Sequence, residues 1–251
     1  MNAFDTPFLV LAVALLAQWL AAYAGNALRK TIRPLQEDER TDFGVVLTAA
    51  LTLLGLIIGF SFAMAVSRYD QRKTFEEAEA NAIGTEYVRA DLLPAEHAAK
   101  LRDLLRKYLD QRVAFYLAGD NDQVGRINAE TDKLQAELWS TVVRTVSPQQ
   151  TPIEALVVSG MNDVLNSQGY TQAAWWNRIP AGAWGLMALV AISCNLLFGY
   201  GEHRVGALAL VLPLIVSISF LLIADIDTPR AGIIRVLPQN LLALSQTMKP
   251  R

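Results

Sequence analysis

The chain has 251 residues, of which 53% are hydrophobic, and its 22 basic and 24 acidic residues give a net charge of −2. Soluble domains contain roughly 45 to 50% apolar residues, so the excess indicates membrane-embedded segments. The lack of a basic excess excludes a nucleic-acid-binding protein. The single cysteine, Cys194, excludes an intramolecular disulfide and a cysteine metal cluster, and we expect it to be a small core residue. His97 and His203 have no metal-ligand spacing around them, so we expect no metal and no cofactor.

The first apolar stretch covers residues 8–28. A secretory signal peptide has a basic start and a shorter apolar core, whereas this N-terminus has Asp5 and no lysine or arginine. We therefore predict a retained transmembrane helix. A short loop of mixed charge follows, and it contains four basic residues: Arg29, Lys30, Arg33 and Arg40.

The second apolar stretch, residues 43–66, has no charged residue and is long enough to cross a bilayer at about 1.5 Å per residue. Neither a proline nor a turn sequence separates it from a polar stretch that keeps a helical rhythm out to Pro94. The pattern therefore predicts one helix that leaves the membrane and becomes the first helix of a water-exposed domain, residues 67–178.

Three further helical patterns follow in this domain. Apolar residues recur at helical spacing in residues 101–116, 124–142 and 153–165. The short connections favour an antiparallel bundle, and no stretch alternates with the period of a strand. The predicted fold class is an all-α integral membrane protein with four transmembrane helices and a helical bundle inserted between the second and third.

The third and fourth apolar stretches, residues 179–200 and 205–224, are joined by only residues 201–204. Such a short connection predicts a transmembrane hairpin. Tryptophan rings favour the headgroup layer, and three of them lie near the start of the third stretch: Trp175, Trp176 and Trp184.

The C-terminal tail, residues 225–251, is expected to contain a short interfacial helix, with Asp227 as its cap and Pro229 as its first residue. Asp225 and Asp227 end the fourth span close to Arg230. Acidic residues at a membrane boundary beside an arginine most often form a local ion pair or a cap. A cation site is the alternative interpretation.

The distribution of basic residues near the span ends predicts the orientation. The excess lies on the side of the bundle and the termini, which favours a cytoplasmic domain in a multi-pass protein of the inner (plasma) membrane. On that side are Arg68, Arg72, Lys73, Arg178, Arg230, Arg235, Lys249 and Arg251, and on the other side are Arg29, Lys30, Arg33, Arg40 and Arg204.

Two features of the second helix could carry function. Gly55 and Gly59 form a small-xxx-small pair, which indicates close helix packing, either within one subunit or against another subunit at a pore-lining helix. The polar residues that follow share a stripe. They could form a solvated face, or they could project toward the central axis of an oligomer and set its charge: Arg68, Arg72, Glu76, Glu79 and Glu86.

We find no nucleophile paired with a base, no phosphate-binding glycine loop and no HExxH pattern, so we do not expect an enzyme. The four apolar spans contain no ionisable Asp, Glu, Lys, Arg or His, which argues against a proton relay or an ion-coupled transporter.

The runs LLGLIIGFSFAMAVSRYDQRKTFEEAEANAIGTEYVRADLLP (residues 53–94) and LLIADIDTPRAGIIRV (residues 221–236) resemble a bacterial membrane family of unknown function described as bestrophin-like. More distantly, they are similar to true bestrophins, which are pentameric anion channels. Gly59-Phe60 followed by Ser67-Arg68-Tyr69 is similar to the end of the bestrophin second helix. Residues 224–229 are similar to the acidic, proline-containing segment after the bestrophin fourth helix.

The resemblance implies four spans, cytoplasmic termini and a helical domain between spans two and three. It also implies a pore neck formed by rings from the second helix, which would be Thr52, Leu56 and Phe60 here. This chain differs in having Thr52 where bestrophins have an apolar residue, and Arg230-Ala231 where they have phenylalanine-glycine.

We therefore predict a homo-oligomeric ion channel, with anions implied by the resemblance and a pentamer if the resemblance extends to assembly. Its partners would be the lipid bilayer, further copies of itself and inorganic ions. The alternative is a membrane-anchored helical bundle that senses a ligand or binds a partner.

Overall fold

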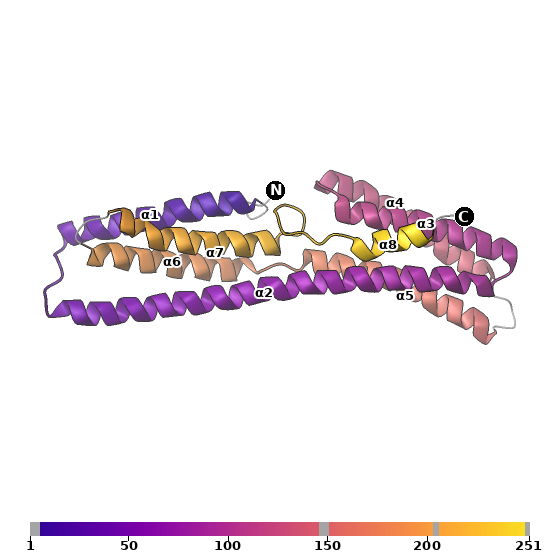
Figure 1. Cartoon of the computed structure of the whole chain (residues 1–251), viewed down its shortest axis with the longest axis horizontal. Coiled ribbons are helices and arrows are strands. Elements are labelled where there is room, and N and C mark those ends of the chain that lie inside the picture. The colour runs from indigo at the N-terminus through magenta and orange to yellow at the C-terminus, as the bar shows by residue number, and fades with distance from the viewer. Residues whose placement is uncertain (1–5, 146–150, 203–205, 249–251) are drawn as a thin grey trace. The chain divides into compact units, whose positions relative to one another are not determined.

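The computed structural model describes residues 6–145, 151–202 and 206–248. All regular elements in these ranges are helical, as predicted, with eight α-helices and short 3-10 turns at Ala90–Leu92 and Ala207–Leu210 (Figure 1). The chain divides into two compact units. Several residues used in the expected orientation and spans lie outside the described ranges: Asp5, His203, Arg204, Val205, Lys249 and Arg251.

Unit one comprises Met1–Arg68 and Arg178–Ile234. It contains α1 (Pro7–Thr31), the first part of α2 (Glu39–Arg89), α6 (Ala181–Gly201) and α7 (Val211–Asp227), and α1 packs against both α6 and α7. By length and composition, three stretches of the described chain contain a helix able to cross a membrane: Pro7–Thr31, Glu39–Leu92 and Pro152–Gly201. Helix α7, the expected fourth span, has 17 residues and is not among them.

Helices α1 and α6 approach each other through glycines. A Cβ on Gly199 would clash with the backbone of Ala22, and a Cβ on Gly25 would clash with the Leu196 carbonyl. Two side-chain hydrogen bonds also link α1 to α6 and α7. Asn195 Nδ2 on α6 donates to Gln18 Oε1 on α1 at 3.0 Å, and Gln18 Nε2 donates to Ser217 Oγ on α7 at 3.1 Å. Small residues and interhelical hydrogen bonds are the features that hold helices together in lipid, where burial of apolar surface gives little.

Unit two comprises Tyr69–Asn177 and Arg235–Arg251. It contains the rest of α2, then α3 (Ala95–Leu117), α4 (Asn121–Thr145), α5 (Pro152–Trp176) and α8 (Gln239–Thr247). Its core consists of apolar side chains from these helices, among them Ile83, Leu105, Leu138 and Met161, each fully buried. The predicted continuous helix beyond the second apolar stretch is confirmed, because α2 is unbroken from Glu39 to Arg89; it ends in the 3-10 turn Ala90–Leu92, just before the expected limit at Pro94.

The expected start of the C-terminal helix is wrong. Asp227 is the last residue of α7, Pro229 lies in a non-helical stretch, and the terminal helix begins at Gln239. Both carboxylate oxygens of Asp227 accept the backbone N–H of Ile179, so this side chain is not available to cap a helix at Pro229. Helix α8 packs against α3, with Leu241 fully buried, and is therefore part of unit two.

Candidate functional site

One face of α2 in unit one is apolar and open. Leu56 is 53% exposed, Phe60 is 65% exposed, and Thr52 is exposed as well. Residues four apart on a helix lie on the same face, so the three side chains form one row. The Thr52 hydroxyl donates to the Thr48 carbonyl at 2.8 Å. Its hydrogen-bonding capacity is thus partly used inside the helix, which reduces the difference between a threonine and an apolar residue at this position.

Gly55 and Gly59 lie beside this row. A Cβ built on either glycine would meet no other atom of the described chain within 4 Å. Within the described residues, neither glycine therefore brings α2 close to another helix of the same subunit, which was one of the two interpretations of the pair.

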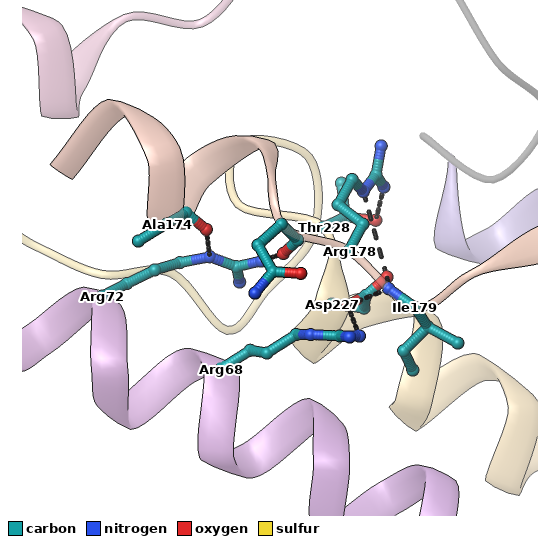
Figure 2. A network of polar contacts seen from close by, with 8 residues as sticks. Arg68, Arg72, Ala174, Arg178, Ile179, Asp227 and Thr228 are labelled. Carbon is teal, nitrogen blue, oxygen red and sulfur yellow. Dashed lines mark hydrogen bonds and ion pairs between the residues drawn. The ribbon is translucent and has the colours of Figure 1, made fainter. Parts of the chain in front are cut away.

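The end of this α2 segment is held by ion pairs around Asp227 (Figure 2). Arg68 Nη1 lies 3.7 Å from one Asp227 oxygen, and Arg178 Nε lies 3.9 Å from the other. The backbone N–H of Ile179 donates to both oxygens at 3.1 Å, and Arg178 Nη2 donates to Thr228 Oγ1 at 2.9 Å. Because Asp227 is buried, these contacts fix the start of α6 and the end of α7 to α2.

Asp225 has a different local role. Its two carboxylate oxygens accept the backbone N–H groups of Ile233 and Ile234, each at 2.8 Å. The intervening turn, which also contains Arg230, requires a glycine at position 232, because Gly232 has a φ of 131° and a Cβ there would clash with the Asp225 carboxylate. Asp225 thus closes a turn, and no group of three metal-ligating side chains occurs in the described part of the chain.

The polar stripe of α2 does not behave as predicted. Arg68 is largely covered by its ion pair, and the four residues beyond it are buried inside unit two instead of facing solvent or a central axis: Arg72, Glu76, Glu79 and Glu86. The physical reason is that partners distant in sequence cover them. Arg72, for example, donates to the backbone carbonyls of Ala174 and Asn177, each at 3.3 Å (Figure 2).

Glu76 caps α8. One carboxylate oxygen accepts the backbone N–H groups of Asn240 and Leu241 at 2.9 and 3.0 Å, and the other accepts Asn240 Nδ2 at 2.6 Å. These N–H groups belong to the first turn of α8, where backbone N–H groups have no acceptor within the helix. The Glu76 carboxylate supplies that acceptor, and its negative charge is favourable at the positive end of the helix dipole.

Glu79 is the centre of a buried cluster. It accepts a hydrogen bond from Arg112 Nε, one from Thr171 Oγ1 at 3.1 Å and a long one from Tyr116 at 3.4 Å. Burial, followed by the Glu79 charge, raises the pKa of Tyr116 above its usual range. Burial alone would lower the pKa of Arg112, but the neighbouring Glu79 reverses this and raises it.

The buried Glu86 carboxylate has weaker compensating contacts than Glu76 and Glu79. Its side chain is fully buried, and its closest cationic group, Arg89 Nη1, is 3.9 Å away. Burial raises the pKa of Glu86 to about 7, with Arg89 opposing the shift and Asp163 adding to it. Gly160 on α5 provides the space for this carboxylate, because a Cβ there would clash with Glu86 Oε2.

Some residues that hold the helices together were not predicted from the sequence. Arg112 lies within the apolar pattern of residues 101–116. An arginine on the buried face of a helix indicates a buried ion pair, and this sign was present in the sequence. Gln18, Asn195 and Ser217 are polar residues within apolar spans, which was a similar signal. Gly199 had no signal of its own, because its role depends on which helix packs against α6.

The folded chain therefore has an all-helical membrane-protein architecture, with apolar helices in unit one and an open row on α2. A model of the bestrophin-like domain matches residues 9–241, so the chain belongs to the bestrophin-like family. This confirms the resemblance drawn from residues 53–94 and 221–236.

Solved structures show the same fold. A mutant bacterial bestrophin homolog from Klebsiella pneumoniae is 12% identical with a TM-score of 0.62, over 98% of this chain and 96% of that one. A structure of the Klebsiella pneumoniae homolog phased on zinc is 15% identical with a TM-score of 0.61, over 96% and 95%. A structure described as a membrane protein mutant is 14% identical with a TM-score of 0.62, over 96% and 95%. At such identities the likeness concerns the fold alone, and none of the curated proteins matches the chain.

Proposed function

We propose that this protein is a homo-oligomeric ion channel, conducting anions, in which α2 of each copy lines a central pore. The observation that carries the proposal is the open face of α2. Leu56 and Phe60 are exposed, and a Cβ built on Gly55 or Gly59 beside them would meet no neighbouring helix within 4 Å in the described part of the chain. Small residues permit close approach of helices in lipid. A second copy is the natural partner for such a face in a family whose distant relatives are pentameric channels.

In this proposal the neck consists of rings of Thr52, Leu56 and Phe60, one from each copy. Residues four apart rise about 6 Å along a helix, so the rings are stacked at that spacing. Apolar rings of this kind gate conduction by excluding water from a narrow pore. The ion pairs of Asp227 with Arg68 and Arg178 hold the pore helix to α6 and α7 about two turns beyond Phe60.

The proposed topology has four spans: α1, residues 43–66 of α2, α6 and α7. Helix α7 has 17 residues, which is at the lower limit of roughly 17 to 25 for a membrane-crossing helix. Residues 67–178 and both termini are cytoplasmic in this scheme, with the protein in the inner membrane. A reporter inserted next to Asp120, between α3 and α4, tests the orientation, and an external position would favour the sensor alternative.

The channel is tested by chloride flux from liposomes that contain Phe60→Ala. Removal of the ring side chain widens and wets the neck, so chloride efflux should rise several-fold over wild type. Phe62→Ala is the matched control, because Phe62 lies on the same helix, is 38% exposed and belongs to a different face. Flux that is unchanged in Phe60→Ala, with the oligomer intact, would contradict the neck assignment.

A further inference from the structure

Helix α1 ends in a basic pocket that the channel proposal does not use. The pocket has a volume of about 290 Å³ and is lined by Asn26, Arg29, Lys30 and Pro34, all in unit one. Asn26 is fixed there by a hydrogen bond of 2.8 Å from its Nδ2 to the Glu202 carbonyl. The site is therefore made from the last turns of α1 and the loop after it.

Arg29 is the unusual member of this pocket. It is only 8% exposed, and within residues 6–145, 151–202 and 206–248 its guanidinium has neither an ion pair nor a hydrogen bond, so its nitrogens are reached from the pocket alone and are not sealed in the protein. A buried cation is costly unless an anion or several acceptors compensate it. Interaction with the negative end of the α1 dipole is favourable, but it is small compared with this cost.

The neighbouring arginine of the loop shows the contrast. Arg33 is largely exposed and forms an ion pair of 2.6 Å with Glu39. Lys30 is exposed at the rim of the pocket and, like Arg29, has no acidic partner in the described ranges. Arg29 and Lys30 thus line the pocket without an acidic partner, whereas Arg33, which does not line it, is paired with Glu39.

We propose that this pocket binds a phosphate group. Arginine offers a planar fork of N–H donors that matches two phosphate oxygens, and lysine adds a second charge. The volume is sufficient for a phosphate and the atoms attached to it. Arg29 directly follows the apolar stretch 8–28, which in the proposed topology puts the pocket at the depth of lipid headgroups. The phosphate comes from a phospholipid or from solution, and this location rests on the proposed function.

The experiment compares ligands that differ in the phosphate alone. Full-length protein in detergent is titrated with phosphatidylglycerol, with the corresponding diacylglycerol that lacks the phosphate, and with inorganic phosphate, and bound ligand is counted by native mass spectrometry. Wild type should bind phosphatidylglycerol at least about tenfold more tightly than Arg29→Gln, which corresponds to about 1.4 kcal/mol. Diacylglycerol should not distinguish the two proteins.

Arg33→Gln is the matched control, because it removes the same charge from the same loop outside the pocket, and its affinity should remain within about twofold of wild type. Binding of inorganic phosphate that Arg29→Gln weakens would identify solution phosphate as the source, whereas a difference seen only with phosphatidylglycerol would identify a lipid. Equal binding by wild type and Arg29→Gln in both arms would overturn the proposal.

A further variant covers the case in which Arg29→Gln does not fold. Lys30→Gln changes an exposed side chain and should weaken binding about threefold, and unchanged affinity in this variant would then overturn the proposal. Chloride flux is measured on the same preparations and separates this result from the channel proposal. Wild-type protein that conducts chloride but binds phosphate no better than Arg29→Gln would reject the pocket and leave the channel proposal standing.

Discussion

The buried Glu79–Arg112 pair permits a quantitative test of unit two. In Arg112→Met the side chain keeps its length but loses its charge and its donors. Glu79, which is fully buried, would then retain only Thr171 at 3.1 Å and Tyr116 at 3.4 Å. Removal of one partner from a buried ion pair leaves an uncompensated charge and costs about 3 to 5 kcal/mol. Loss of the contact between Arg112 and the Phe115 ring, whose centroid lies 4.5 Å away, acts in the same direction.

The expected cost is a large part of the roughly 5 to 15 kcal/mol that stabilises a typical folded protein. For a chain of this size, each kcal/mol lowers the melting temperature by about 2 to 4 °C, so Arg112→Met should melt roughly 6 to 20 °C below wild type. Tryptophan fluorescence of the purified protein in detergent measures this difference. Arg126→Met on α4 is the control, because Arg126 is exposed, and its melting temperature should equal that of wild type.

A double variant tests the mechanism. In Glu79→Gln with Arg112→Met, both charges are absent and the glutamine can still bond with Thr171. Replacement of both members of a buried pair is often nearly neutral, so the double variant should melt well above Arg112→Met. A melting temperature at or below that of the single variant would refute the idea that an uncompensated Glu79 charge causes the loss.

Two further predictions concern Glu86 on α2 and Gly199 on α6. Burial raises the pKa of Glu86 to about 7 from 4.5, so the folded state binds a proton that the unfolded state has lost, and stability should fall as the pH rises from about 5 through 7. Glu86→Gln should make the melting temperature less dependent on pH in this range, whereas Glu77→Gln, at an exposed position, should not. The same pH dependence in wild type and both variants would argue against a raised pKa of Glu86. Gly199→Ala should lower the melting temperature, because its Cβ would clash with Ala22, while Gly185→Ala on the same helix has open space and should have little effect; equal melting of the two variants would contradict the close α1–α6 contact.

The architecture of the helices could be predicted because it depends on local pattern. Helix α2 is continuous from Glu39 to Arg89, as expected from a stretch without proline, and the three later helices of unit two follow their apolar stripes. These features depend on residues within a few turns of each other. Hydrophobic periodicity therefore records them directly.

The environment of the polar stripe could not be predicted in the same way. Glu76 caps a helix whose first residues lie more than 160 positions away, and Arg72 donates to carbonyls about 100 positions away. A charged residue on a helix looks the same in sequence whether it faces water or a partner from another helix. The expected cap at Pro229 failed for the same reason, since a distant backbone N–H, that of Ile179, competes for Asp227.

The row of Thr52, Leu56 and Phe60 on α2 could be predicted in part. Helical spacing places Thr52, Leu56 and Phe60 on one face from sequence alone, and the structure adds that other parts of the described chain leave this face open. What covers the face, lipid or a second copy, separates a channel from a membrane-anchored bundle.

The most direct test of the account is the subunit count and symmetry of the protein in nanodiscs, determined by native mass spectrometry and electron microscopy. The account predicts a closed ring of identical copies in which Leu56 and Phe60 of every α2 face the central axis. A monomer, or a ring in which these two side chains point toward lipid, would contradict the proposal that this chain forms a pore.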